Sequence, residues 1–97
     1  MVRSLAGDED GRKVPPRKSP EKVPEAVTFG RRLRELRKAR GWSQERLAEA
    51  ADINVVQLSH LENGANEPKL RTILRLARAL GVKPGELLDG IRVRRGR

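Results

Sequence analysis

The sequence predicts an all-α protein, because its apolar residues recur with helical spacing and its core contains almost no aromatic side chains. Among 97 residues there is one Phe, one Trp and no Tyr, so the core must be built from Leu, Ile, Val and Ala. Such a core suits packed helices better than a sandwich of sheets. Six prolines and nine glycines are unevenly placed, which predicts an ordered unit shorter than the chain.

Residues 1–27 are predicted to form a disordered arm. They are polar, mixed in charge and interrupted by four of the prolines. Proline removes a backbone donor and disfavours helix at the preceding residue. The arm also has too little apolar area to offset the entropy of ordering. We interpret it as a solubilising leader or linker. The alternative is a DNA-contacting arm that uses Arg12-Lys13 and Arg17-Lys18.

The first helix is expected from about Thr28 to Arg40. Thr28 is the expected N-cap, and Gly41 is expected to stop the helix. One face is apolar and comprises Phe29, Leu33 and Leu36. The other face is basic and comprises Arg31, Arg32, Arg34, Lys38 and Arg40.

Two short helices follow, joined by a tight turn. Ser43 is expected to cap the first of them, whose narrow apolar face allows close helix approach. The second is expected from about Val55 to Glu62, with Asn54 as its cap. The turn between them needs one residue in a left-handed conformation, and Asp52 tolerates that conformation better than most residues.

A longer helix is expected from about Leu70 to Leu80, followed by a short one from roughly Pro84 to Asp89. In the longer helix a 3.6-residue period separates an apolar stripe from an outward-facing basic one. The apolar stripe comprises Ile73, Leu76, Ala77 and Leu80, and the basic one comprises Arg71, Arg75 and Arg78. In the short helix, Leu87 and Leu88 are expected to return to the core.

The net charge of +9 favours a polyanionic partner, namely DNA, RNA or an anionic membrane surface. The last seven residues alone carry four arginines and no acid. No cysteine is present, which excludes disulfides and thiolate metal sites. No apolar run approaches the roughly 20 residues that span a membrane. The N-terminus lacks the apolar region of a secretory signal, so we expect a cytosolic protein.

Catalysis finds little support in the sequence. Ser59 and His60 are neighbours on a helix and therefore point about 100° apart, which is incompatible with a catalytic pair. His60 is the only histidine, so no metal site is predicted either. We expect no cofactor, because there is no glycine-rich phosphate loop.

The ordered signals from Phe29 to Leu88 resemble the Cro/phage-repressor type (Xre family) of helix-turn-helix domain, over about 60 residues. The resemblance centres on the stretch 40–64, with its cap at Ser43, its tight turn and its Asn63-Gly64 stop. It implies a compact five-helix, lambda-repressor-like DNA-binding domain over residues 28–90, followed by a short basic tail, 91–97. Asp52 departs from the family pattern, which usually places Gly there.

The same resemblance implies which residues read bases. The positions that face DNA in the family are Asn54, Val55, Val56, Gln57, Ser59 and His60. A valine cannot hydrogen-bond a base edge, but it can pack on a thymine methyl group. We expect Val56 to be exposed. Val55 is left open between base contact and inward packing.

The resemblance also implies contacts to the DNA backbone and one internal ion pair. The phosphate-binding candidates are Ser43, Gln44, Asn63, Asn66 and Lys69. Gln44 lies at a helix N-terminus, which favours anions, and it can also buttress the reading helix. Exposed N–H groups at Asn63 and Gly64 are expected to cap a second phosphate. Arg37 and Glu62 are expected to pair and to lock the first helix to the end of the reading helix.

In function, the resemblance implies a sequence-specific transcriptional regulator that binds double-stranded DNA in the cytoplasm, at the nucleoid. We expect a repressor that acts as a homodimer on an inverted-repeat operator. Two alternatives remain: the antitoxin of a toxin–antitoxin pair, with the toxin as protein partner, and a protein-bridging coactivator. An RNA-binding role ranks lowest because base stacking requires aromatic side chains. No membrane partner is expected.

Overall fold

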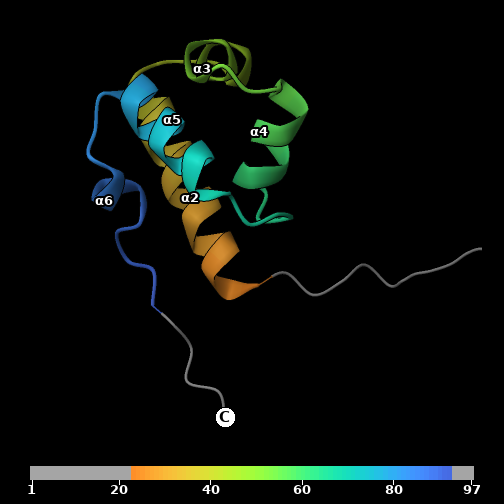
Figure 1. The fold of residues 1–97 in the computed structure, drawn as a ribbon, viewed down its shortest axis with the longest axis vertical. Coiled ribbons are helices and arrows are strands. Elements are labelled where there is room, and N and C mark those ends of the chain that lie inside the picture. The colour runs from red at the N-terminus through yellow and green to blue at the C-terminus, as the bar shows by residue number, and fades with distance from the viewer. Residues whose placement is uncertain (1–22, 93–97) are drawn as a thin grey trace, which may run out of the picture.

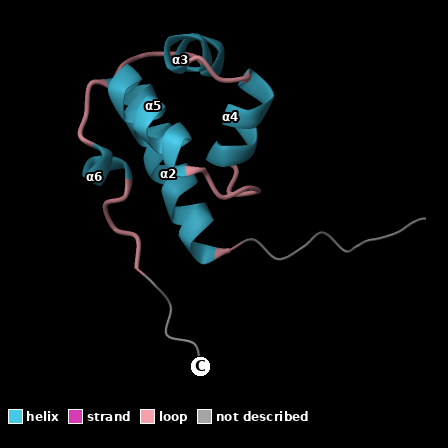
Figure 2. Ribbon diagram, viewed as in Figure 1, coloured by secondary structure: helices cyan, strands magenta, loops and turns pink. Residues whose placement is uncertain are grey.

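The computed structural model describes residues 23–92, and all regular elements within that range are helices (Figure 2). Numbered as in Figure 1, they are α2 (Pro24–Ala39), α3 (Gln44–Ala51), α4 (Val55–Glu62), α5 (Leu70–Leu80) and α6 (Pro84–Leu87). None of the helices in this range has both the length and the apolar character needed to cross a membrane.

The helices enclose one core of aliphatic side chains. α2 packs against α4 and α6, α3 packs against α4 and α5, and α5 also packs against α6 (Figure 1). The largest fully buried side chains are Phe29, Leu33, Leu47, Leu58, Leu61, Leu76, Leu80 and Leu87. Burial of each such side chain stabilises the fold by about 1.5–3 kcal/mol. The predicted all-α architecture is confirmed.

α2 begins earlier than the sequence predicts. It starts at Pro24 with Val23 as its N-cap residue, so the prediction that Thr28 caps this helix is wrong. Proline suits the first helical position because its φ is already helical and its missing N–H has no partner to lose there. Ala26 is buried in the first turn. The expected boundary between residues 27 and 28 therefore falls inside α2.

Two glycines bring α2 close to the end of α4. A methyl group on Gly30 would lie 2.6 Å from the carbonyl oxygen of Glu62 and closer still to that of Leu61. Gly64 has φ +74°, and a methyl group there would lie 2.9 Å from the Cα of Val27. Only glycine fits at these two contacts, because backbone atoms already occupy the space that a side chain would need.

Of the two C-terminal helices, α5 has the predicted bounds and α6 ends earlier than predicted. α5 spans the expected residues and ends at Gly81, which is left-handed. α6 stops at Leu87 rather than at Asp89. Leu87 is fully buried, whereas Leu88 is 42% exposed, so the prediction that Leu88 returns to the core is wrong. Consecutive residues on a helix point about 100° apart, and a single turn can direct only one of them inward.

Candidate nucleic-acid interface

α3, the turn that follows it and α4 form a helix-turn-helix whose ends are capped by side chains. The Ser43 hydroxyl accepts a hydrogen bond from the backbone N–H of Arg46 at 3.0 Å. The side-chain oxygen of Asn54 accepts from the N–H groups of Val56 at 2.7 Å and Gln57 at 3.4 Å. Each cap stabilises its helix by about 1 kcal/mol. Both caps are those expected from the sequence.

The turn depends on a left-handed residue. Asp52 has φ 58° and ψ 49°, the conformation that the sequence predicts for this position. The backbone N–H of Ile53 donates to the carbonyl oxygen of Ala48 at 3.0 Å, which closes the turn. Arg75 reaches across from α5 and donates to the carbonyl oxygen of Asp52 at 3.3 Å. The turn is thus hydrogen-bonded both to α3 and to α5.

α4 has a buried face and an exposed face. Leu58 and Leu61 are at most 1% exposed and face the core. Val55 is half-buried and packs against that core, whereas Val56 is 56% exposed. The exposed candidates for base reading are Asn54, Val56, Gln57 and His60, and the half-buried ones are Val55 and Ser59.

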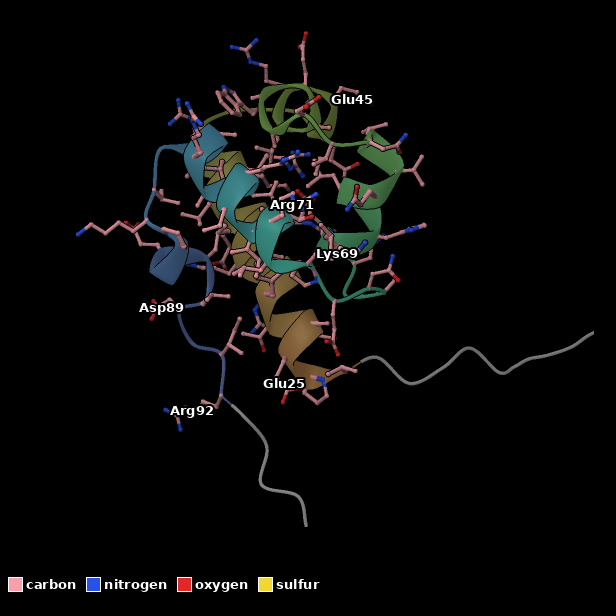
Figure 3. The ribbon with its side chains drawn as sticks, viewed as in Figure 1. Glu25, Glu45, Lys69, Arg71, Asp89 and Arg92 are labelled. Carbon is pink, nitrogen blue, oxygen red and sulfur yellow. The ribbon has the colours of Figure 1, made fainter. Side chains whose placement is uncertain are left out.

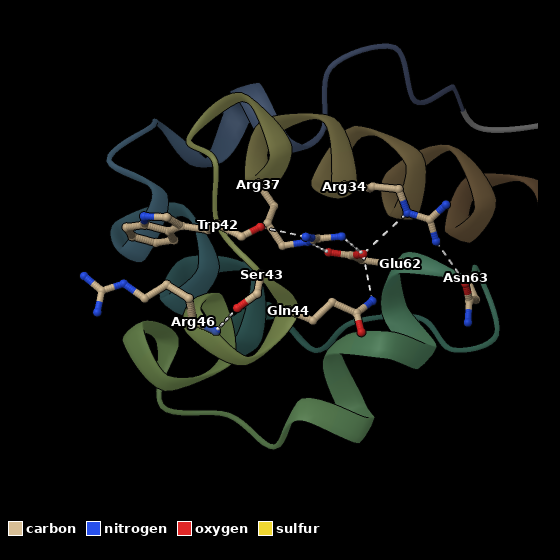
Figure 4. A network of polar contacts seen from close by, with 8 residues as sticks. All are labelled: Arg34, Arg37, Trp42, Ser43, Gln44, Arg46, Glu62 and Asn63. Atoms are coloured by element: carbon tan, nitrogen blue, oxygen red, sulfur yellow. Dashed lines mark hydrogen bonds and ion pairs between the residues drawn. The ribbon is translucent and has the colours of Figure 1, made fainter.

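The end of α4 is fixed by the buried carboxylate of Glu62 (Figure 4). The Arg37 guanidinium donates to both of its oxygens, from Nε at 2.6 Å and from Nη2 at 3.0 Å. Gln44 donates to the same carboxylate at 3.0 Å. Arg37 also donates to the carbonyl oxygen of Trp42 at 2.8 Å. The expected Arg37–Glu62 pair is therefore present, and it joins α2, α3 and α4.

The environment of Glu62 favours its ionised form. Burial alone opposes the charge, but hydrogen bonds from Arg37 and Gln44, together with the charge of Arg37, outweigh burial. The pKa of Glu62 therefore lies below its ordinary value. The pKa of Arg37 is raised, chiefly by its hydrogen bond to Glu62. Both groups are charged at neutral pH.

The phosphate candidates lie around this network. Gln44 is half-buried and its side-chain nitrogen buttresses Glu62, while Ser43, Asn66 and Lys69 are exposed. Lys69 lies at the start of α5, next to Arg71 (Figure 3).

The expected backbone site at Asn63 and Gly64 is not open to a ligand. The N–H of Asn63 donates to the carbonyl oxygen of Ser59 at 3.0 Å, and that of Gly64 donates to Leu61 at 3.2 Å. The prediction that these N–H groups cap a phosphate is wrong, because the end of α4 uses them itself.

Arginines of the basic face predicted for the first helix also make hydrogen bonds within the protein. Arg40 donates to the carbonyl oxygen of Leu80 at 2.9 Å, and Arg32 donates to that of Glu86 at 2.9 Å. Sequence reasoning missed Arg34, which donates to Glu62 at 3.5 Å and to the side chain of Asn63 at 3.0 Å. Its position three residues before Arg37 places it on the same side of the helix, which was the available signal.

Trp42 packs against the core, and two arginines lie over its ring. The guanidinium carbons of Arg40 and Arg46 lie 4.4 Å and 5.1 Å from the ring centroid. Further basic residues that the sequence suggests as DNA contacts lie outside the described residues: Arg12-Lys13, Arg17-Lys18, Arg94, Arg95 and Arg97. Arg92, the first arginine of the tail, is exposed.

Known proteins are similar to this chain in sequence. The chain is 45% identical over 60 residues to the HTH-type transcriptional regulator DdrOP3 of Deinococcus deserti, which covers 62% of this chain and 46% of that protein. It therefore spans about half the length of that relative. It is 37% identical over 64 residues to the control protein C.BamHI of Bacillus amyloliquefaciens, covering 65% of this chain and 79% of that protein.

Among solved structures, the restriction-modification controller protein C.AhdI from Aeromonas hydrophila matches with a TM-score of 0.66 and 43% sequence identity. That match covers 67% of this chain and 98% of the controller protein. The family profile described as helix-turn-helix matches residues 33–87, which is more than half of the sequence. The chain belongs to the helix-turn-helix family.

Proposed function

We propose that this protein is a sequence-specific DNA-binding transcriptional regulator in which α4 enters the major groove. The observation that carries the proposal is the exposed face of α4, whose last residue, Glu62, is joined to α2 and α3 by buried hydrogen bonds. A helix with that geometry is the reading helix of helix-turn-helix proteins. The net charge of +9 supports binding to the phosphate backbone.

The side chains of α4 suggest how a sequence would be read. Gln57 can bond an adenine through two hydrogen bonds, Val56 can pack on a thymine methyl group, and His60 can bond a base edge. Asn54 is less suited to reading, because its side-chain oxygen already caps α4 at 2.7 Å from Val56 N. Ser43, Gln44, Asn66 and Lys69 would position the domain through phosphates, since backbone contacts fix register without reading sequence.

A single domain of this size reads only one half-site, so we propose that the protein acts as a homodimer. Large apolar side chains are exposed along α5 and after α6, with Leu70 at 72%, Leu74 at 48% and Leu88 at 42%. Ile73 lies beside these leucines of α5 and lines an apolar hollow of about 400 Å³. Glu25 also lines it, at the end of the domain where Arg92 lies (Figure 3).

A second copy of the chain is the occupant that fits this surface. Exposed apolar area of this kind marks an interaction site, and a two-fold contact pairs the same patch on both copies. A dimer that reads an inverted repeat needs its two α4 helices in successive major grooves, about 10 base pairs apart. A dimer bound across a promoter would act as a repressor by excluding other proteins.

The test is selection of bound fragments from sheared genomic DNA by the purified protein at near-physiological salt. Recovery of a short inverted repeat with half-sites one helical turn apart is the expected result. Uniform recovery that vanishes as salt rises would show that the arginines bind DNA without reading it, and would overturn the proposal.

A narrower candidate function is control of restriction-modification genes. It is favoured by one observation, the 43% identity to C.AhdI over 98% of that controller protein. The same selection experiment tests it. Fragments that map upstream of a nuclease or a DNA methyltransferase gene would support this role, whereas fragments upstream of unrelated genes would exclude it.

A further inference from the structure

Arg34 lies where α2 passes the end of α4, and only part of its guanidinium is used within the protein. Its Nε contacts Glu62 at 3.5 Å and its Nη2 donates to the Asn63 side chain at 3.0 Å. Within the described residues, its Nη1 group makes no hydrogen bond. The side chain is 43% exposed, so the remaining donors face solvent. Figure 4 shows Arg34 and Gln44 reaching Glu62 from different sides.

The charge of Arg34 is not neutralised by this cluster. Glu62 supplies one negative charge, and Arg37 already pairs with both of its oxygens at 2.6 Å and 3.0 Å. Arg34 approaches the same carboxylate only at 3.5 Å, and through a single nitrogen. Arg34, Arg37 and Glu62 together therefore carry one net positive charge. Because Arg37 is buried, the exposed part of that charge lies on Arg34.

The neighbouring backbone does not compete for an anion at this position. The N–H groups of Asn63, Gly64 and Ala65 all donate to carbonyl oxygens of α4. Gln44, the proposed phosphate ligand of α3, contacts the same oxygen of Glu62 as Arg34 does. Both side chains therefore lie within hydrogen-bonding range of one carboxylate oxygen.

We propose that Arg34 binds the DNA backbone directly, as a phosphate ligand from α2 beside the Gln44 position. Its contacts to Glu62 and Asn63 already order the guanidinium before DNA binds, so that little side-chain entropy is lost on binding. This proposal rests on the DNA-binding function proposed above. It adds a backbone contact from a helix outside the helix-turn-helix, and that contact carries no sequence preference.

The experiment measures binding of the full-length protein to a fluorescent 20-base-pair duplex of mixed sequence, titrated at several salt concentrations. Arg34→Gln is compared with wild type, with Arg34→Lys and with Arg78→Gln. Arg78 is exposed near the end of α5 and makes no hydrogen bond with another described residue through its side chain, so its replacement removes the same charge elsewhere. Urea unfolding of each variant checks that the fold is retained.

We expect Arg34→Gln to weaken binding about fivefold, within the range of an exposed ion pair. It should also reduce the slope of log K against log salt by about 0.9, the value for one phosphate contact. Arg34→Lys should restore the slope, because the charge is kept, and Arg78→Gln should leave the slope unchanged.

Three outcomes would count against the proposal in distinguishable ways. Weaker binding with an unchanged slope would make Arg34 a positioning residue only and overturn the direct contact. An equal change of slope in Arg78→Gln would show that net charge, not this site, is responsible. If the wild-type protein fails to bind any duplex, the proposed DNA-binding function itself fails.

Discussion

Glu62 is the last residue of α4, and its carboxylate accepts hydrogen bonds from Arg34, Arg37 and Gln44 on two other helices. A buried carboxylate is tolerated only where charge and hydrogen bonds replace its lost hydration. Removal of the carboxylate would leave Arg34, Arg37 and Gln44 without their shared acceptor. This single side chain therefore couples the stability of the fold to the orientation of the proposed reading helix.

Replacement of Glu62 by Gln should lower the free energy of unfolding by about 3 kcal/mol at neutral pH, because it leaves Arg37 buried without its counter-charge. The effect should depend on pH in a defined direction. Since the folded-state pKa of Glu62 is depressed, its stabilising contribution is present above the unfolded-state pKa and is lost as pH falls through the folded-state value. Urea unfolding of both proteins from pH 7 down to pH 3 measures this.

The difference between wild type and Glu62→Gln isolates this carboxylate, because the other acidic groups titrate in both proteins. The two stabilities should converge as pH falls. A difference that stays constant across the whole pH range would show that the ionisation of Glu62 contributes nothing.

Variants of His60 and Gln44 should distinguish base reading from binding to the DNA phosphates. We expect His60→Ala to reduce discrimination between operator variants by about 1–3 kcal/mol at one base position, because His60 is exposed on the reading face. Gln44→Ala should weaken binding to all sequences similarly, since it removes a phosphate ligand and a buttress of α4. Binding of both variants to a panel of single-base operator mutants is the measurement. Equal losses on every sequence would show that His60 does not read bases.

At the scale of the elements, the caps of α3 and α4 and the turn between these helices could be predicted from the sequence, because they depend on residues close together in the chain. Ser43 and Asn54 cap their helices through their own side chains, and Asp52 adopts the left-handed conformation that its turn demands. The start of α2 could not be predicted from the sequence. A proline such as Pro24 breaks a helix when it lies in the interior, but it favours a helix when it is the first residue. Only the packing of Ala26 and Val27 against the rest of the fold decides between these two roles.

The close contact between α2 and α4 could not be predicted from the sequence either, since a glycine within a helical pattern does not show which part of the chain packs against it. Gly30→Ala should lower the free energy of unfolding by about 2 kcal/mol, because the added methyl group would meet the carbonyl oxygens of Leu61 and Glu62. This loss should exceed the gain of about 1 kcal/mol in helix propensity. Urea unfolding measures the balance.

Gly85→Ala is the matched control for that change. Gly85 lies in α6, and a methyl group there would meet nothing within 4 Å. It should be neutral or slightly stabilising by the same propensity argument. A Gly30→Ala protein as stable as Gly85→Ala would mean that α2 and α4 can separate without cost.

At the scale of the whole molecule, the exposed charge is distributed differently from the sequence pattern. The sequence places Arg32 and Arg40 on the basic face of the first helix, but in the structure they also donate to the carbonyl oxygens of Glu86 and Leu80. Long cationic side chains can cross between helices, which a helical period alone cannot show. The base-reading role of α4 stays a prediction: Val56, Gln57 and His60 are exposed on the side of α4 away from the buried Leu58 and Leu61.

The apolar surface of α5 and α6 leads to a prediction about the assembled molecule. The double variant Leu70→Gln/Leu74→Gln should dissociate the proposed dimer, raising its dissociation constant by at least ~100-fold, because burial of each leucine contributes about 1.5–3 kcal/mol. These two side chains are 72% and 48% exposed in the monomer, so their replacement should leave the core intact. Sedimentation equilibrium gives the mass, and titration of a two-half-site operator should then show weaker, non-cooperative binding.

Ala50→Gln is the control for this double variant. It places the same polar group on an exposed position of α3 and should keep the mass and the affinity of wild type. If the double variant also keeps them, the two copies meet through another surface, and the leucines of α5 have no part in holding the two reading helices one turn of DNA apart.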